Sequence, residues 1–74
     1  MTKYNWKMAL SGMTRHPRPE EIIRLAHDEG MTNAQIVRIL TGGRTFRDAQ
    51  QIARDYAHLL DLSLKDFMDL RRND

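Results

Sequence analysis

The chain has 74 residues, enough for one small domain and too few for a two-domain enzyme, a Rossmann unit or a TIM barrel. Its 41% hydrophobic and 30% charged residues are typical of a folded chain rather than a disordered one. Because there is no cysteine, disulfides, thiolate zinc sites and cysteine nucleophiles are excluded. The apolar runs are too short for a membrane span or a signal peptide, so we expect a cytoplasmic protein without membrane contact.

The sign of the charge alternates along the chain. Residues 1–19 carry four basic and no acidic side chains, whereas residues 20–37 carry one basic and four acidic ones. Residues 38–54 hold four arginines against one aspartate, and residues 55–74 hold five aspartates against three basic residues. Arginine outnumbers lysine nine to three, and it binds phosphate and guanine through paired hydrogen bonds. The pattern predicts a polarised molecule with a basic face for a polyanion.

We expect residues 1–18 to form a basic arm ahead of a helical domain over residues 19–74. Asn5 is a candidate cap for a short helix from Trp6 to Ser11 within this arm. The stretch His16-Pro17-Arg18-Pro19 favours extended backbone, because each proline disfavours helix in the residue before it.

Two short helices are predicted after the arm. The first covers residues 19–29, since Pro19 suits the first position of a helix. The second covers residues 33–41, because Thr32 and Gln35 form a capping-box pattern. Their apolar residues follow the helical spacing and are Ile22, Leu25, Ala26, Ile36, Ile39 and Leu40.

The longest predicted helix covers residues 45–60, with Thr45 as its cap, and Ser63 is the candidate cap of a last helix. The residues expected to face inward are Phe46, Ala49, Ile52, Ala53, Tyr56, Leu59, Leu60, Leu64, Phe67 and Met68. No stretch alternates as a strand would, so the predicted fold class is all-α, with three or four helices.

No catalytic motif is present in the sequence. Neither Ser11 nor Ser63 lies in a nucleophile motif, and the three histidines lack the spacing of metal ligands. The turn over residues 41–45 lacks the lysine and the preceding strand of a nucleotide-binding loop. We therefore expect neither an enzyme nor a bound cofactor or metal.

The middle of the chain carries a pattern with a functional meaning. The stretch His16-Pro17-Arg18-Pro19 precedes one predicted helix, Gly30-Met31-Thr32 opens the next, and Ala49 and Ile52 face inward on the third. With these features, residues 13–60 resemble helix-turn-helix DNA-binding domains of the three-helix, homeodomain-like kind. They are similar to the DNA-binding domain of resolvases and invertases. The turn before the third helix is longer than in that family, and no recombinase catalytic region is present, so the resemblance implies DNA binding alone.

The outward face of the helix over residues 45–60 carries side chains suited to reading bases. At about 100° per residue, this face lies opposite the apolar side of the helix. Arginine pairs with guanine and glutamine with adenine in the major groove of double-stranded DNA. The residues expected to contact bases are Arg47, Gln50, Gln51 and Arg54. Those expected to contact the DNA backbone are Arg15, Arg18, Gly43, Arg44 and Thr45. The sequence thus predicts a sequence-specific transcriptional regulator, whose small size fits a phage or plasmid.

A second function stays open from the sequence: a small interaction module, a regulator or inhibitor that docks on a larger protein partner. Tyr4 and Trp6 on the arm, and the apolar series over residues 59–70, would suit such docking. A homodimer through the C-terminal helix would use the same series, and helix-turn-helix proteins commonly bind DNA as dimers. A steep dependence of binding on salt would distinguish a DNA partner from an apolar protein partner.

Overall fold

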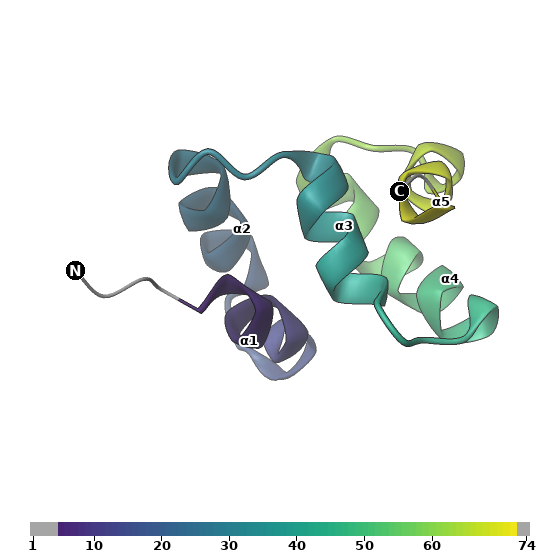
Figure 1. The fold of residues 1–74 in the computed structure, drawn as a ribbon, viewed down its shortest axis with the longest axis horizontal. Helices are drawn as coiled ribbons and strands as arrows, with labels where there is room; N and C mark the ends of the chain where they lie inside the picture. Colours follow the sequence, from purple (N-terminus) through teal and green to yellow (C-terminus); the bar gives the residue numbers. More distant parts are fainter. Residues whose placement is uncertain (1–4, 73–74) are drawn as a thin grey trace.

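The computed structural model describes residues 5–72, and the regular secondary structure of this part of the chain consists of helices, without strands (Figure 1). The predicted all-α class is therefore confirmed, but the described residues form five α-helices rather than the three or four expected. The elements in chain order are α1 (Trp6–Ser11), the 3₁₀-helix η1 (Met13–Arg15), α2 (Pro19–Asp28), α3 (Asn33–Thr41), α4 (Phe46–Tyr56), the 3₁₀-helix η2 (Ala57–Leu60) and α5 (Leu64–Arg72). No helix among the described residues is long and apolar enough to cross a membrane.

Four of the helices begin at the side-chain caps that the sequence predicts. Asn5, Thr45 and Ser63 each accept a hydrogen bond from the backbone amide three residues later, at 3.0–3.2 Å. Thr32 and Gln35 form both hydrogen bonds of the capping box at the start of α3. Each cap satisfies an amide that has no partner within its helix, and this fixes where the helix starts.

The central element of the fold is α3. It packs against α1 and α2 on one side and against α4 and α5 on the other (Figure 1). Accordingly, Ile36 and Val37 of α3 have no exposed surface. Because α3 lies between the two pairs, α2 and α4 stand at opposite ends of the longest axis of the molecule (Figure 1). Each end therefore presents a surface of its own.

The segment that was expected to be a basic arm contributes to the core. Leu10 of α1 and Met13 of η1 are both fully buried, and α1 packs on α3. A domain of this size has few apolar side chains to bury, so the core needs those of the first turns as well. Residues 6–15 thus belong to the folded body, and of the predicted arm residues 1–4 lie outside the described part. The buried hydrophobic residues are Leu10, Met13, Ile23, Ala26, Ile36, Val37, Leu40, Ala49, Ile52, Ala53, Ala57, Leu60 and Phe67.

Three residues predicted to face inward are exposed instead. Leu25 is 46% exposed, Phe46 58% and Leu64 50%. In α2 the apolar residues span a wide arc, and packing buries Ile23 in place of Leu25. Phe46 lies in the first turn of α4, where its ring meets the guanidinium of Arg71 at 5.8 Å rather than the core. The helical periodicity therefore predicted which side of each helix is apolar, but not which residues at the margin of that side are buried.

The helix predicted over residues 45–60 changes its geometry before its end. It is α-helical to Tyr56 and continues as η2, and the chain then turns at Asp61, whose φ is 57°. The carboxamide of Asn33 fixes η2 by donating to the carbonyl of Leu60 at 3.1 Å. The carboxamide oxygen of the same residue lies 2.6 Å from Nε2 of His27. This one side chain links α2, α3 and η2.

Candidate nucleic-acid interface

The outward face of α4 is exposed as the sequence predicts. Its side chains Arg47, Gln50, Gln51 and Arg54 all lie on the surface. On the opposite side of the helix, Ala49, Ile52 and Ala53 are buried against the body. The helix is thereby held by small and branched apolar side chains, and its polar face projects from one end of the molecule.

One of these residues is engaged within its own helix. Nε2 of Gln51 donates a hydrogen bond of 3.3 Å to the carboxylate of Asp55, one turn later. Burial of the ring and the same Asp55 carboxylate raise the pKa of Tyr56 above its usual value of 10.0. A carboxylate therefore stands at the edge of the outward face, and the bond to it uses one of the two N–H donors of Gln51.

The turn between α3 and α4 depends on glycine and arginine. Gly43 has a φ of 72°, a conformation that residues with a Cβ rarely adopt. A Cβ on Gly42 would lie 3.1 Å from the carbonyl oxygen of Arg38, which is a tight approach. Arg44 closes the turn: its backbone amide donates to Thr41 at 3.1 Å, and its Nε donates to the carbonyl of Leu40 at 3.2 Å.

A basic pocket adjoins the start of α4. This hollow, of about 430 Å³, is lined by three arginines from three different elements, together with the small residues of the turn. Arg38 comes from α3, Arg44 from the turn and Arg71 from the last turn of α5. The lining residues are Arg38, Thr41, Gly42, Gly43, Arg44 and Arg71. Three arginines thus contribute to the lining of one hollow, and arginine is the residue best suited to phosphate oxygens.

The arginines of the basic pocket retain most of their donors for a ligand. Nε of Arg38 donates to the carbonyl of Ala34 at 3.2 Å, and Nη2 of Arg71 donates to the carbonyl of Arg44 at 3.4 Å. Each guanidinium has five N–H donors, and one of them is used in each of these bonds. The sequence predicted a backbone contact for Arg44 but none for Arg38 or Arg71. Arg71 lies 27 positions from Arg44, and only the packing of α5 brings the two together.

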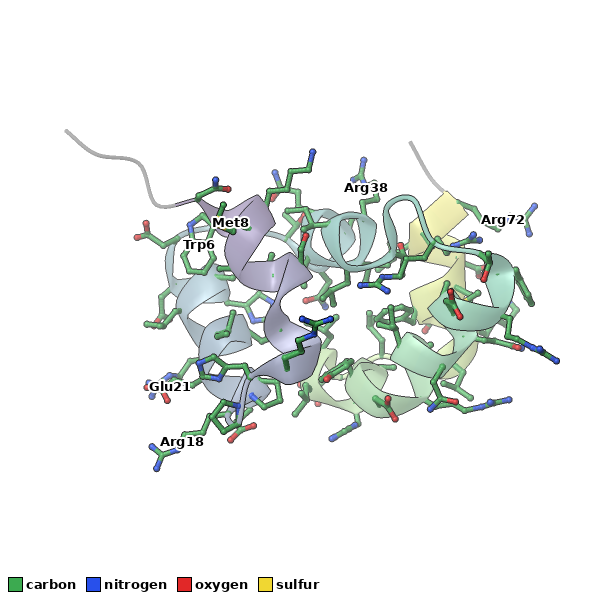
Figure 2. The ribbon with its side chains drawn as sticks, turned by 90° about the horizontal axis from the view of Figure 1, so that it is seen from below. Trp6, Met8, Arg18, Glu21, Arg38 and Arg72 are labelled. Atoms are coloured by element: carbon green, nitrogen blue, oxygen red, sulfur yellow. The ribbon has the colours of Figure 1, made fainter. Side chains whose placement is uncertain are left out.

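Neither of the two arginines predicted for the arm lines the basic pocket. Arg15 and Arg18 are exposed, and Arg18 borders a separate hollow together with Glu20, Glu21 and Arg24. Figure 2 shows Arg18 at the end of the molecule formed by α1 and α2, far from Arg38 and Arg72. The structure thus gathers Gly43 and Arg44 with Arg38 and Arg71, whereas Arg18 lies at the other end of the molecule.

No family model matches the chain, and comparison with curated proteins and with solved structures gave no match. Within residues 5–72, no group of three or more histidine, aspartate or glutamate side chains is placed to hold a metal ion. The candidate site described above consists of the exposed face of α4 and the basic pocket at its start.

Proposed function

We propose that the chain is a small DNA-binding regulator of transcription, in which α3, the glycine turn and α4 act as a helix-turn-helix unit. In this proposal α4 enters the major groove, and Arg47, Gln50, Gln51 and Arg54 contact the edges of bases. The arginines of the basic pocket contact the phosphates that flank the groove, which fixes the register of α4 on the duplex.

The observation that carries the proposal is the position of the basic pocket next to the outward face of α4. Arg44 precedes the cap of α4 by one residue, and Arg47 follows the cap by two. A reading helix needs phosphate contacts close to its start, since backbone contacts orient the helix while base contacts specify the sequence. Both kinds of side chain meet within one stretch of surface, and the turn glycines leave that surface open to a close approach.

The other helix that contributes to this end is less suited to reading bases. Asn33 of α3 is bonded to His27 and to Leu60, and Gln35 completes the capping box of its own helix. Of the polar side chains on α3, Arg38 remains beside the basic pocket. This distribution favours α4 as the reading helix and α3 as a source of one phosphate contact.

The alternative function, an interaction module docking through the apolar series over residues 59–70, finds less support. Leu60 and Phe67 are buried, and four others of the series pack against the core: Leu59, Leu62, Met68 and Leu70. Leu64 alone of this series is largely exposed within the described chain. One leucine is a small basis for a protein interface or for a homodimer through α5.

The salt dependence of DNA binding tests the proposal. Fluorescence anisotropy with a labelled random-sequence duplex would be measured over a range of salt concentrations for the wild type, Arg38→Ala and Arg44→Ala. We expect each variant to bind all sequences more weakly and to lower the slope of log K against log salt by about 1. Arg24→Ala is the matched control, because it removes the same charge beside Glu20 and Glu21 at the other end of the molecule. Equal slopes for all four proteins would refute a phosphate-binding pocket.

A further inference from the structure

Phe46 is an exposed aromatic side chain at the start of the proposed reading helix. It is the first residue of α4, directly after the cap Thr45, and 58% of its surface is exposed. A single exposed apolar side chain is common on protein surfaces. This one, however, is held in place by a neighbouring helix and lies between the two parts of the candidate interface.

The ring of Phe46 is held by the last turn of α5. The guanidinium of Arg71 lies over this ring, and the same side chain donates a hydrogen bond to the carbonyl of Arg44. The hydrogen bond ties Arg71 to the turn in front of α4, and the cation–aromatic contact orients the ring. A side chain that is oriented before binding loses less conformational entropy when it meets a ligand. The ring is therefore a preorganised apolar surface.

Phe46 lies between the basic pocket and the side chains expected to contact bases. On one side it meets Arg71, which lines the basic pocket. On the other side, the exposed Gln50 follows Phe46 by four residues and thus by about one helical turn on the same face of α4. Such residues have Cβ atoms about 6 Å apart, and successive bases of a DNA strand are about 3.4 Å apart. A base contact by Gln50 would therefore bring Phe46 to a neighbouring base pair.

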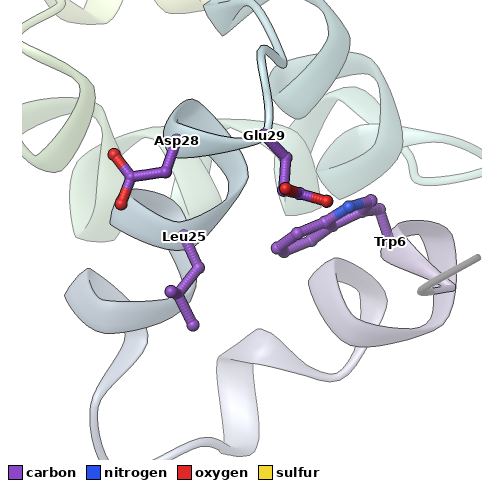
Figure 3. A pocket seen from close by; sticks show the side chains of 4 residues that line it. All are labelled: Trp6, Leu25, Asp28 and Glu29. Carbon is purple, nitrogen blue, oxygen red and sulfur yellow. The ribbon is translucent and has the colours of Figure 1, made fainter.

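Phe46 is separated from the other exposed large apolar side chains of residues 5–72. Met8 and Leu25 belong to α1 and α2 at the opposite end of the molecule, where Leu25 lines a hollow of its own (Figure 3). Leu64 is the first residue of α5, whereas Arg71, which covers Phe46, follows about 10 Å further along that helix. An isolated ring among polar side chains suits a small apolar group better than the wide apolar surface of a protein partner.

We propose that Phe46 reads a thymine, by packing the exposed part of its ring against the 5-methyl group of that base. This role rests on the proposed insertion of α4 into the major groove. The thymine methyl is the apolar group that the bases present in this groove, and phenylalanine is one of the side chains that contact it. The arginines and glutamines of α4 suit guanine and adenine through hydrogen bonds. Phe46 adds recognition of a base by its methyl group, next to the base that Gln50 contacts.

The test removes only a methyl group from the DNA. The probe is the fluorescein-labelled duplex that the wild-type protein selects from a random library, with each thymine in turn replaced by deoxyuridine. Uracil keeps the hydrogen-bonding groups of thymine and lacks its methyl group. Fluorescence anisotropy measures the affinity. We expect the replacement at one position to weaken binding of the wild type about fourfold, which corresponds to the burial of one methyl-sized group.

Two variants at the same position separate the methyl contact from a structural role. In Phe46→Ser the replacement by deoxyuridine should have no effect. Phe46→Met keeps an apolar side chain of similar reach, so the same replacement should still weaken its binding about twofold or more. Both variants lack the ring that Arg71 covers, so a difference between them reports the contact with DNA. Leu64→Ser makes a similar change at an exposed residue of α5 and should respond as the wild type does.

Three outcomes would overturn this role of Phe46 alone. In the first, no thymine of the selected duplex is sensitive to the replacement in the wild type. In the second, the replacement weakens binding of the wild type and of Phe46→Ser equally, which would assign the methyl group to another residue. In the third, Phe46→Ser keeps the discrimination but changes the oligomeric state in sedimentation, which would identify a second copy as the partner of the ring. The wild type binds DNA in all three, whereas absence of binding to every duplex would refute the proposed function and this role with it.

Discussion

Nη2 of Arg71 donates a hydrogen bond of 3.4 Å to the carbonyl oxygen of Arg44, and its guanidinium lies 5.8 Å from the centre of the Phe46 ring. The last turn of α5 thereby holds the turn in front of α4. The proposed reading helix starts at this turn. Arg71 therefore has two roles: it fixes the start of α4, and it lines the basic pocket.

The first prediction measures these two roles of Arg71 separately, one by stability and the other by DNA binding. Arg71→Ala should lower the free energy of unfolding by about 1 kcal/mol, through loss of one hydrogen bond and one cation–aromatic contact. It should also weaken binding to every DNA sequence. Arg72→Ala removes the same charge from the neighbouring exposed residue and should leave the urea midpoint unchanged. A urea midpoint for Arg71→Ala equal to that of the wild type would show that the turn does not depend on this contact.

The second prediction tests whether α1 is part of the hydrophobic core, as the burial of Leu10 indicates. Leu10→Ala removes a fully buried side chain and should cost about 2–5 kcal/mol of unfolding free energy. Met8→Ala in the same helix is the control, since Met8 is 72% exposed and should be nearly neutral. Thermal and urea unfolding measure both. If Leu10→Ala melts at the wild-type temperature, residues 6–15 are an appendage after all.

The third prediction concerns the glycine turn. Gly43→Ala forces a Cβ into the left-handed region at a φ of 72° and should cost about 1–2 kcal/mol. Gly12→Ala is the matched control: its φ is −89° and its Cβ would meet ordinary contacts at 3.6 Å, so it should leave stability unchanged or slightly raised. Equal losses in the two variants, measured by urea unfolding, would contradict the conformation of the turn.

The outward face of α4 gives the fourth prediction. Arg47→Ala or Gln51→Ala should cost about 1–3 kcal/mol of binding at one base position and relax the preference there. Because both side chains are exposed, the melting temperature should stay unchanged. Selection of bound duplexes from a random library, followed by competition with single-base variants, measures the preference. A variant lacking Arg47, Gln50, Gln51 and Arg54 that selects the same sequence as the wild type would exclude α4 as the reader.

The fifth prediction is a pH dependence that involves Tyr56. Its pKa is raised in the folded chain by burial and by Asp55, so the neutral phenol is the form that folding favours. The resulting stabilisation is present below the ordinary pKa of about 10 and is lost as the pH rises through the higher folded value. Urea unfolding between pH 8 and pH 11.5 should therefore show wild-type stability falling relative to Tyr56→Phe above pH 10. If the difference in stability between the wild type and Tyr56→Phe stayed constant over this range, the pKa of Tyr56 would be the same in the folded and unfolded chain.

The local signals in the sequence determined the helices and where they start. Thr32, Thr45 and Ser63 cap the helices that they were expected to cap, since a side chain and an amide three residues later interact within one turn. The same holds for the exposed side of α4, because helical periodicity alone separates Arg47 and Arg54 from Ile52. Such features depend on neighbours within four residues, and the order of amino acids specifies those directly.

Only the tertiary structure decided which elements meet. It placed α3 between two helix pairs, buried Leu10 and Met13, and brought Arg71 to Arg44 across 27 residues. It also left Leu25 exposed in a hollow that Glu29 helps to line, although the helical pattern predicted Leu25 to face inward. The physical reason is that periodicity defines the apolar side of each helix to within an arc. Which residues of that arc are covered depends on the neighbouring helices, and these come from distant parts of the chain.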